Sequence, residues 1–354
     1  MTRSVKANRW LSASLERRTL PSVTELPRSF WSIQQRPQQM RKHLLDLEAD
    51  PRFEVSWVCV GTRNRPLVAL PLYRPETDRW PDEAYDPDRA LGTGERSSPR
   101  DWVLGGGRAD LTTGLLVHPG APASALEAAA AAAVAAAAEE AAAHRRRLAL
   151  LYVGADGGLL LNAARRVGVE AEASQGSRFV VDDVGDSLAS YLEKLPSRHR
   201  SVVRRDLRDL ADARLVATPV PWIDVLDDAC DLIAENHERH GEADHPKLVA
   251  QRLRRWLGDE GLDCVAFALR REGVLLAATL GWSYAHVLEL YELGLSWELG
   301  DRRRLAYTEM LFYAPLRLAW ERGLRTLDLA LAGEPAKRLR GARAIPLHGL
   351  VVRS

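Results

Sequence analysis

Apolar runs and the turn between them predict a β-hairpin near the start of the chain. Residues 53–60 and 67–73 are rich in Val, Leu and aromatic side chains, and the polar turn 61–66 joins them. Two such runs, separated by turn-forming residues, are typical of paired antiparallel strands. After the hairpin we expect an irregular loop from residue 74 to about 107, where Pro, Asp, Arg and Gly are frequent, and then a short strand over 111–117.

An alanine-rich segment follows in the first half of the chain. Residues 121–143 are mostly alanine, interrupted by Glu127, Glu139 and Glu140. Alanine is the best helix former, so the segment predicts one long helix, and its uncharged part is too short to cross a membrane. Further elements are predicted for this half: a strand over 148–153, a helix over 159–167 and a strand over 179–182.

The second half has a different order of elements, with helices first and strands afterwards. Its apolar spacing predicts an α/β fold with several antiparallel strands. Helices are expected over 187–195, 197–213, 223–239, 246–257 and 305–322, and strands over 214–220, 264–270, 274–282, 286–295, 326–330 and 347–352.

Length and composition indicate an ordinary globular protein of two domains, which we place at 1–183 and 184–354. The 49 Lys and Arg residues balance 48 Asp and Glu residues, so the net charge of +1 excludes a strongly basic body that binds nucleic acid non-specifically. The three cysteines are far apart and predict no disulfide framework. We expect a cytoplasmic protein without a signal peptide or membrane span.

Three segments of the second half carry a family resemblance. They are residues 195–208 (LPSRHRSVVRRDLR), residues 307–313 (YTEMLFY) with 321–324 (ERGL), and residues 333–341 (GEPAKRLRG). In order and spacing they resemble the FemAB-like branch of the GNAT acyltransferases, which includes bacterial proteins of peptidoglycan biosynthesis or recognition. The resemblance implies two tandem GNAT-like α/β domains with mixed, largely antiparallel sheets flanked by helices. It implies a shortened N-terminal domain on the acceptor side, a catalytic C-terminal domain and an acceptor cleft between them.

A basic stripe is predicted on the helix 197–213. Arg200, Arg204 and Arg208 repeat every four residues and therefore share one helical face, which could hold the phosphates of a transfer RNA, a nucleotide-linked precursor or coenzyme A. The alternative is a solvated face on which these arginines pair with the aspartates of the same helix. Those aspartates are Asp206, Asp209 and Asp212.

The resemblance also identifies candidate reacting groups. Lys337 matches the lysine of the FemAB-like closing loop, where Arg340 and Gly341 follow it, and could steady a carbonyl oxygen or a phosphate. The alternative for Lys337 is an exposed loop lysine without a role. Glu309 is our first candidate for the proton acceptor, although an acidic residue in a first helical turn also suits a structural role. Tyr291 and Glu292 are further candidates, and strand alternation predicts that they face opposite sides.

The absence of one motif indicates which acyl donor the protein uses. An enzyme that uses coenzyme A carries a glycine-containing loop that cradles the pyrophosphate, but residues 297–307 here have Gly300 before three arginines and no glycine after them. This favours aminoacyl-tRNA as donor, with Arg303, Arg304 and Tyr307 as donor-binding candidates. An acyl-CoA-dependent N-acetyltransferase and a non-catalytic ligand-binding protein remain alternatives.

Other chemistries have little support in the sequence. It contains no GxSxG, HExxH or Walker motif, and Gly105 to Gly107 lack the context of a phosphate loop. His237, His240 and His245 lie near acidic residues, but their spacing matches no metal site, and a solvated loop is the simpler interpretation. We expect no bound cofactor and no metal, an amine-bearing acceptor, and no DNA partner.

Overall fold

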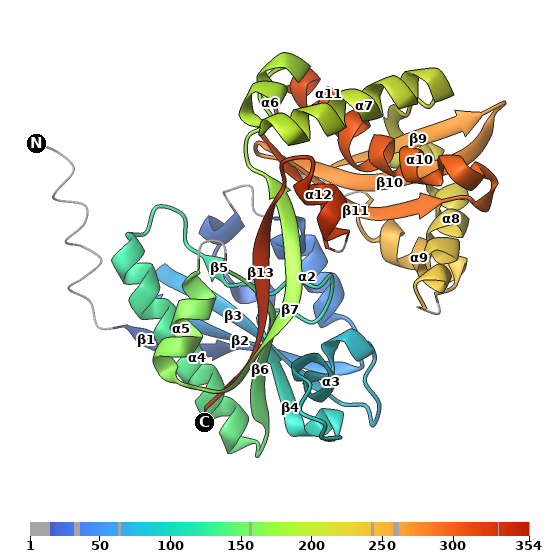
Figure 1. Cartoon of the computed structure of the whole chain (residues 1–354). Helices are drawn as coiled ribbons and strands as arrows, with labels where there is room; N and C mark the ends of the chain where they lie inside the picture. The colour runs from blue at the N-terminus through green and yellow to red at the C-terminus, as the bar shows by residue number, and fades with distance from the viewer. Residues whose placement is uncertain are drawn as a thin grey trace, which may run out of the picture. The chain divides into compact units, whose positions relative to one another are not determined.

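The computed structural model describes residues 15–31, 36–62, 65–155, 158–241, 244–257, 262–331 and 333–353. The chain divides into two compact units, Met1–Gly176 with Ile345–Ser354, and Ser177–Ala344 (Figure 1). The expected division at 183/184 differs from this one chiefly in the last strand. That strand, β13 (Arg343–Val352), pairs with β6 (Arg147–Gly154), and the pairing assigns residues 345–354 to the first unit.

The first unit contains a mixed sheet. The predicted hairpin is confirmed, because β2 (Phe53–Thr62) and β3 (Arg65–Pro75) pair antiparallel along their length. The alanine helix is α4 (Ala123–Ala143), and its buried alanines pack against β2, β3 and β6. The strand order is β1 (Glu16–Leu20), β2, β3, β4 (Trp102–Gly105), β6 and β13, with β4 and β6 parallel and β5 (Leu116–Val117) paired to β3.

Two expectations for the first unit are wrong. The segment from 74 to 107 contains the buried strand β4, whose short apolar sequence is hidden among polar residues. The strand expected over 111–117 is shortened to β5, and it cannot begin at Leu111, because this residue takes a left-handed φ of 46°. The remaining elements of this unit are the helices α2 (Arg41–Glu48), α3 (Pro87–Leu91) and α5 (Leu159–Val167), and the 3-10 turns Val23–Glu25, Arg28–Trp31, Pro37–Gln39, Glu83–Tyr85 and Pro99–Asp101.

The second unit contains five strands of its own and the end of β7 (Val169–Val181). In order they are β8 (Thr218–Pro221), β9 (Asp263–Arg271), β10 (Val274–Tyr284), β11 (Val287–Leu295), β12 (Thr326–Asp328) and β7. All neighbours are antiparallel except β11 and β12, which are parallel. The helices are α6 (Leu188–Lys194), α7 (Ser197–Ala213), α8 (Leu226–Arg239), α9 (Pro246–Arg254), α10 (Arg303–Thr308), α11 (Ala314–Arg322) and α12 (Glu334–Arg338), with 3-10 turns at Trp222–Asp224 and Trp297–Arg302.

Helices cover both faces of this second sheet. Trp282 of β10 belongs to one apolar cluster together with residues of α8 and α9, whereas Leu288 and Leu290 of β11 belong to another together with α7, α10 and α11. Figure 1 shows α7 and the pair α8 and α9 on different sides of β10. The predicted helix 305–322 begins earlier, at Arg303, and a π-helical turn, Glu309–Tyr313, interrupts it.

The strands β11 and β12 separate within the second unit. Their parallel pairing covers residues 287–289 and 326–328 and ends at the pair Glu289 and Asp328, although β11 continues to Leu295. β11 also carries a bulge, because Leu280 pairs with Glu292 and the next residue, Gly281, pairs with Leu290. Tyr291 is the extra residue, and a bulge of this kind redirects the side chains that follow it.

Candidate active site

A buried lysine marks the end of β12. The Nζ atom of Lys337, on α12, donates to the backbone carbonyls of Leu329 and Leu331, each at 2.5 Å, and the residue is 2% exposed. Burial lowers the pKa of Lys337 to about 7, although the charge of Asp328 opposes the shift. The lysine is therefore an amine that gains or loses its proton near neutral pH, and it is not an exposed loop lysine.

Tyr307 lies beside this lysine. Gly333 takes a left-handed φ of 67°, and a Cβ there would clash with the Tyr307 hydroxyl and lie 3.6 Å from Cε of Lys337. The Tyr307 side chain is half-buried, and its hydroxyl has no hydrogen-bond partner among the described residues. Of the sequence-predicted residues, Tyr307 and Lys337 are thus brought together around Gly333.

Asp206 connects α7 to this loop. Its Oδ2 atom accepts from the Tyr313 hydroxyl at 2.8 Å and lies 2.5 Å from Nη2 of Arg340, with all three side chains buried. The Tyr191 hydroxyl, from α6, donates to the carbonyl of Arg340 at 2.5 Å. The predicted pairing of Asp206 with arginines on the surface of its own helix is wrong, because Asp206 lies on the inner face with Val203 and Leu210. Arg340 is likewise buried in this contact and is not a free donor-binding group.

A second buried charge cluster lies where β11 and β12 separate. Nη2 of Arg178, on β7, is 3.0 Å from Glu289 and 2.6 Å from Asp328, and the Tyr284 hydroxyl donates to Glu289 at 2.7 Å. Two carboxylates directly opposite each other repel, so the guanidinium between them compensates the pair. Burial raises the pKa of Asp328, an effect that Glu289 reinforces and Arg178 opposes. Sequence reasoning missed Arg178; the available signal was a charged residue directly before the apolar run at 179–181.

Glu309 is held by other protein groups. Its Oε1 accepts from the backbone N–H of Ala217 at 2.9 Å, and both carboxylate oxygens contact the guanidinium of Arg317. The residue is 1% exposed. Both carboxylate oxygens are thus engaged by protein groups, so the geometry favours the structural role for Glu309.

The bulge corrects the expected orientation of Tyr291 and Glu292. Tyr291 packs against Trp282 and Trp256, and Glu292, instead of facing the other side, also turns toward α8 and α9. Its carboxylate lies 3.2 Å from Nε2 of His237 and 2.9 Å from Nη2 of Arg252. Neither residue presents a free proton acceptor.

His237, on α8, does not lie in a solvated loop as expected, but contacts two carboxylates. Nδ1 of His237 lies 3.0 Å from Asp244, and its hydrogen bond with Glu292, against the effect of burial, raises the pKa of His237 to about 9. Glu242 lies outside the described residues. Among the residues that the structure describes, no group of three His, Cys, Asp or Glu could hold a metal ion.

The three arginines of the predicted stripe on α7 differ in exposure. Arg204 and Arg208 are exposed, whereas Arg200 is half-buried and donates from Nη1 to the carbonyl of Leu195 at 2.9 Å. Gly341, also predicted to bind donor, takes a φ of 83° against Leu195 and serves packing between α6 and the loop.

Arg303, in the turn between β11 and α10, does not point its guanidinium toward a ligand site. This residue donates from Nη1 to the carbonyl of Leu295 at 2.7 Å and from Nη2 to Asn236 at 3.0 Å, so its guanidinium faces the protein. Arg239 stacks on Trp297 at 3.3 Å and covers the same turn. Arg304 is exposed.

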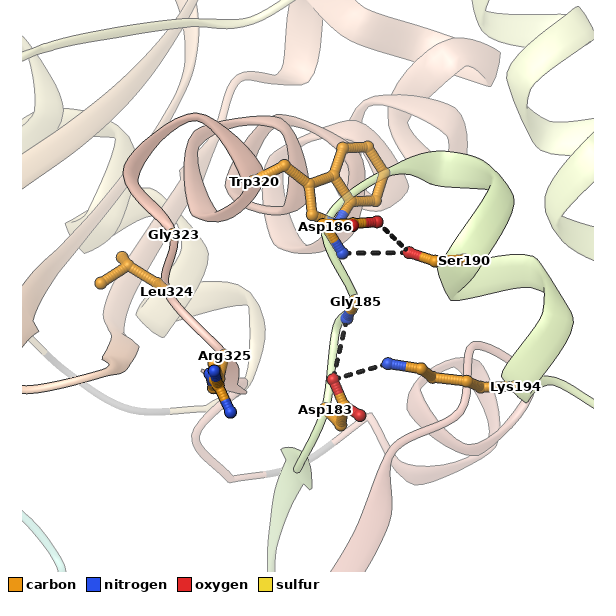
Figure 2. A pocket seen from close by; sticks show the side chains of 9 residues that line it. All are labelled: Asp183, Gly185, Asp186, Ser190, Lys194, Trp320, Gly323, Leu324 and Arg325. Carbon is orange, nitrogen blue, oxygen red and sulfur yellow. Dashed lines mark hydrogen bonds and ion pairs between the residues drawn. The ribbon is translucent and has the colours of Figure 1, made fainter.

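A pocket of about 360 Å³ lies at the opposite end of β12 from Lys337 (Figure 2). Lys194 forms an ion pair with Asp183 at 2.6 Å on its wall, and Gly323 to Arg325 lead into the start of β12. None of the sequence-predicted site residues lines it. The lining residues are Asp183, Gly185, Asp186, Ser190, Lys194, Trp320, Gly323, Leu324 and Arg325.

Comparison with known proteins identifies a domain in the second half of the chain. Residues 197–338 match the sequence profile of the acetyltransferase (GNAT) domain, and no curated protein matches the chain in sequence. Within the described ranges, every helix is too short or too polar to cross a membrane.

Solved structures share the fold across both halves. FemX is similar over 92% of this chain and 94% of its own, with a TM-score of 0.57 and 12% identity. A tandem GNAT protein from the clavulanic acid biosynthesis pathway is similar over 95% of this chain and 98% of its own, with a TM-score of 0.51 and 14% identity. The expected tandem GNAT-like fold is confirmed. Residues 197–338 thus match a GNAT domain, and the chain as a whole shares the tandem fold of FemX and of the clavulanic acid pathway protein.

Proposed function

We propose that this acyltransferase forms an amide by transferring an aminoacyl group from aminoacyl-tRNA to an amine acceptor, a cell-wall precursor or a peptide-like small molecule. The observation that supports this donor most directly is the turn between β11 and α10, where the guanidinium N–H groups of Arg303 are bound to the carbonyl of Leu295 and to Asn236. A pyrophosphate would need free N–H groups at this position. The 3′ end of a transfer RNA has an ester and no pyrophosphate, and therefore needs no such cradle.

Lys337 and Tyr307 are the groups that we assign to the reacting centre. In the transfer, the acceptor nitrogen attacks the ester carbonyl, the C–N bond forms, the C–O bond to the ribose breaks and the ribose oxygen takes up a proton. Two N–H groups of Lys337 are directed at the carbonyls of Leu329 and Leu331, so the neutral amine keeps its lone pair available for the acceptor's proton. The Tyr307 hydroxyl can donate to the developing oxyanion.

Glu309 receives a different role from the one first expected. Through Arg317 and the backbone of Ala217 it fixes the π-helical turn that follows Tyr307. We therefore assign Glu309 as a positioning residue.

The assay is donor consumption that depends on an added amine. The purified protein is incubated with a mixture of aminoacyl-tRNAs or with acetyl-CoA, and amide formation is followed by mass spectrometry over a panel of amines that includes cell-wall precursors. Amide formation from aminoacyl-tRNA supports the proposal, and removal of Lys337 or Tyr307 is expected to lower it about a hundredfold or more. Amide formation from acetyl-CoA alone would favour the acyl-CoA alternative.

A further inference from the structure

The outward face of α7 carries cations without acidic partners. Arg204, Arg205 and Arg208 are exposed and form no ion pair within the described ranges. Asp206 points inward to Arg340, and neither Asp209 nor Asp212 forms an ion pair with these arginines in the part of the chain that the structure describes. Some exposed arginines elsewhere in the chain do pair with an acidic residue, among them Arg89 with Glu83, Arg165 with Glu172 and Arg254 with Asp227.

The spacing of these arginines gives one continuous surface. Arg204 and Arg208 are one helical turn apart, Arg205 lies beside them, and small side chains stand three and seven residues before Arg204. Those small residues are Ser197 and Ser201, both exposed, so a bulky partner can approach the guanidinium groups.

The charge of this surface is local and is not a property of the whole chain. The net charge is only +1, so a polyanion attracted to α7 would recognise this helix and not a generally basic protein. Guanidinium groups bind phosphate oxygens with two parallel hydrogen bonds, which matches a backbone that presents a phosphate at every nucleotide.

We propose that the outward face of α7, formed by Arg204, Arg205 and Arg208, docks the phosphate backbone of an RNA, namely the acceptor arm of the donor transfer RNA. This proposal rests on the proposed function, because it names the surface that would hold that donor.

The inner face of the same helix connects this surface to the reacting loop. Asp206 lies between Arg205 and Leu207 in sequence and pairs with Arg340, three residues after Lys337. A helix with its side chains is about 10–12 Å across, so RNA bound on the outer face would lie about one helix diameter from Arg340. Its unpaired 3′ end is long enough to cover such a distance.

The experiment is binding of fluorescently labelled, uncharged tRNA to the full-length protein, measured by anisotropy between 50 and 200 mM salt. The test variant is Arg204→Gln, Arg205→Gln and Arg208→Gln combined. The matched control removes the same charge from paired arginines, Arg89→Gln, Arg165→Gln and Arg254→Gln. Circular dichroism and melting temperature check that each variant is folded.

We expect the test variant to bind at least tenfold more weakly at low salt. The slope of log K against log salt should fall by about 2, since each lost phosphate contact removes about 0.7–0.9 from it. The control variant should keep its affinity within about twofold. If the triple variant does not fold, Arg208→Gln alone should lower the slope by about 1.

Other outcomes would overturn the proposal. Unchanged tRNA affinity in the test variant would do so even if the wild type transfers aminoacyl groups, and the proposed function would survive. An equal loss in the control variant would show that only overall charge matters. Binding of phosphatidylglycerol vesicles to this face, without tRNA binding, would identify a membrane surface instead. Amide formation by the wild type from acetyl-CoA alone would contradict the proposed function itself.

Discussion

Asp206 and Arg340 form a buried ion pair that joins three segments widely separated in sequence. Asp206 lies on α7, Arg340 follows α12, and Tyr313, from the π-helical turn, donates to the same carboxylate oxygen. These are the three segments that carry the family resemblance. Their shared contact explains why they occur together: each supplies one part of a single buried polar cluster beneath the Lys337 loop.

Breaking this pair should destabilise the fold strongly. Arg340→Met leaves the Asp206 carboxylate buried without a cation, and loss of one partner of a buried pair costs about 3–5 kcal/mol. Chemical denaturation of the variant measures this loss. The control is Arg343→Met, because Arg343 pairs with Asp182 on the surface and its loss should cost less than about 1 kcal/mol. Similar free energies of unfolding for both variants would contradict the buried role of Arg340.

Glu309→Gln should affect stability more than turnover. The substitution removes the charge that holds Arg317, and a lost hydrogen bond to a charged group costs about 1.5–3 kcal/mol. Lys337→Met should instead lower turnover about a hundredfold or more, as expected for a positioned proton acceptor. Steady-state kinetics and thermal unfolding on both variants separate the roles. A larger loss of turnover in Glu309→Gln would restore Glu309 as the base.

The protonation of Lys337 should appear in the pH dependence of stability. Its pKa is about 7 in the folded protein, whereas the unfolded chain keeps the proton up to the usual value of 10.5. Between these values the unfolded state binds more protons, so the free energy of unfolding of the wild type, relative to Lys337→Met, should rise with pH. Urea denaturation of both proteins from pH 6 to 10 measures the difference. A difference independent of pH would show that the amine is not perturbed.

His237 should show the opposite sign. Its pKa is raised from 6.5 to about 9 by the hydrogen bond with Glu292, so it stabilises the fold fully below pH 6.5 and loses this contribution as the pH rises through 9. The free energy of unfolding of the wild type relative to His237→Asn should therefore fall over this range. If the two proteins respond equally to pH, the ion pairs of His237 with Glu292 and Asp244 do not persist in solution.

Local pattern was sufficient to predict much of the fold. The hairpin of β2 and β3, the alanine helix α4 and the helix α7 follow from apolar spacing and helix propensity, which act within a few residues. Strand β4 was missed because its burial comes from its neighbours β3 and β6, which are distant in sequence.

The candidate site was only partly predictable, because its chemistry depends on tertiary contacts. Lys337 and Tyr307 were identified by resemblance, but the burial that shifts the pKa of Lys337 is not visible in sequence. The bulge at Tyr291 reversed the expected direction of Glu292. The inward direction of Asp206 could have been predicted, since it shares a helical face with Val203 and Leu210.

The most direct test is a donor competition in one reaction. Wild-type protein and Lys337→Met are each given aminoacyl-tRNA and acetyl-CoA together with the same amine acceptors, and the amide products are identified by mass spectrometry. We predict aminoacyl amides from the wild type, at least about a hundredfold less product from Lys337→Met, and no acetylated amine above the protein-free control. Acetylated product from the wild type without any aminoacyl product would contradict the assignment of the donor.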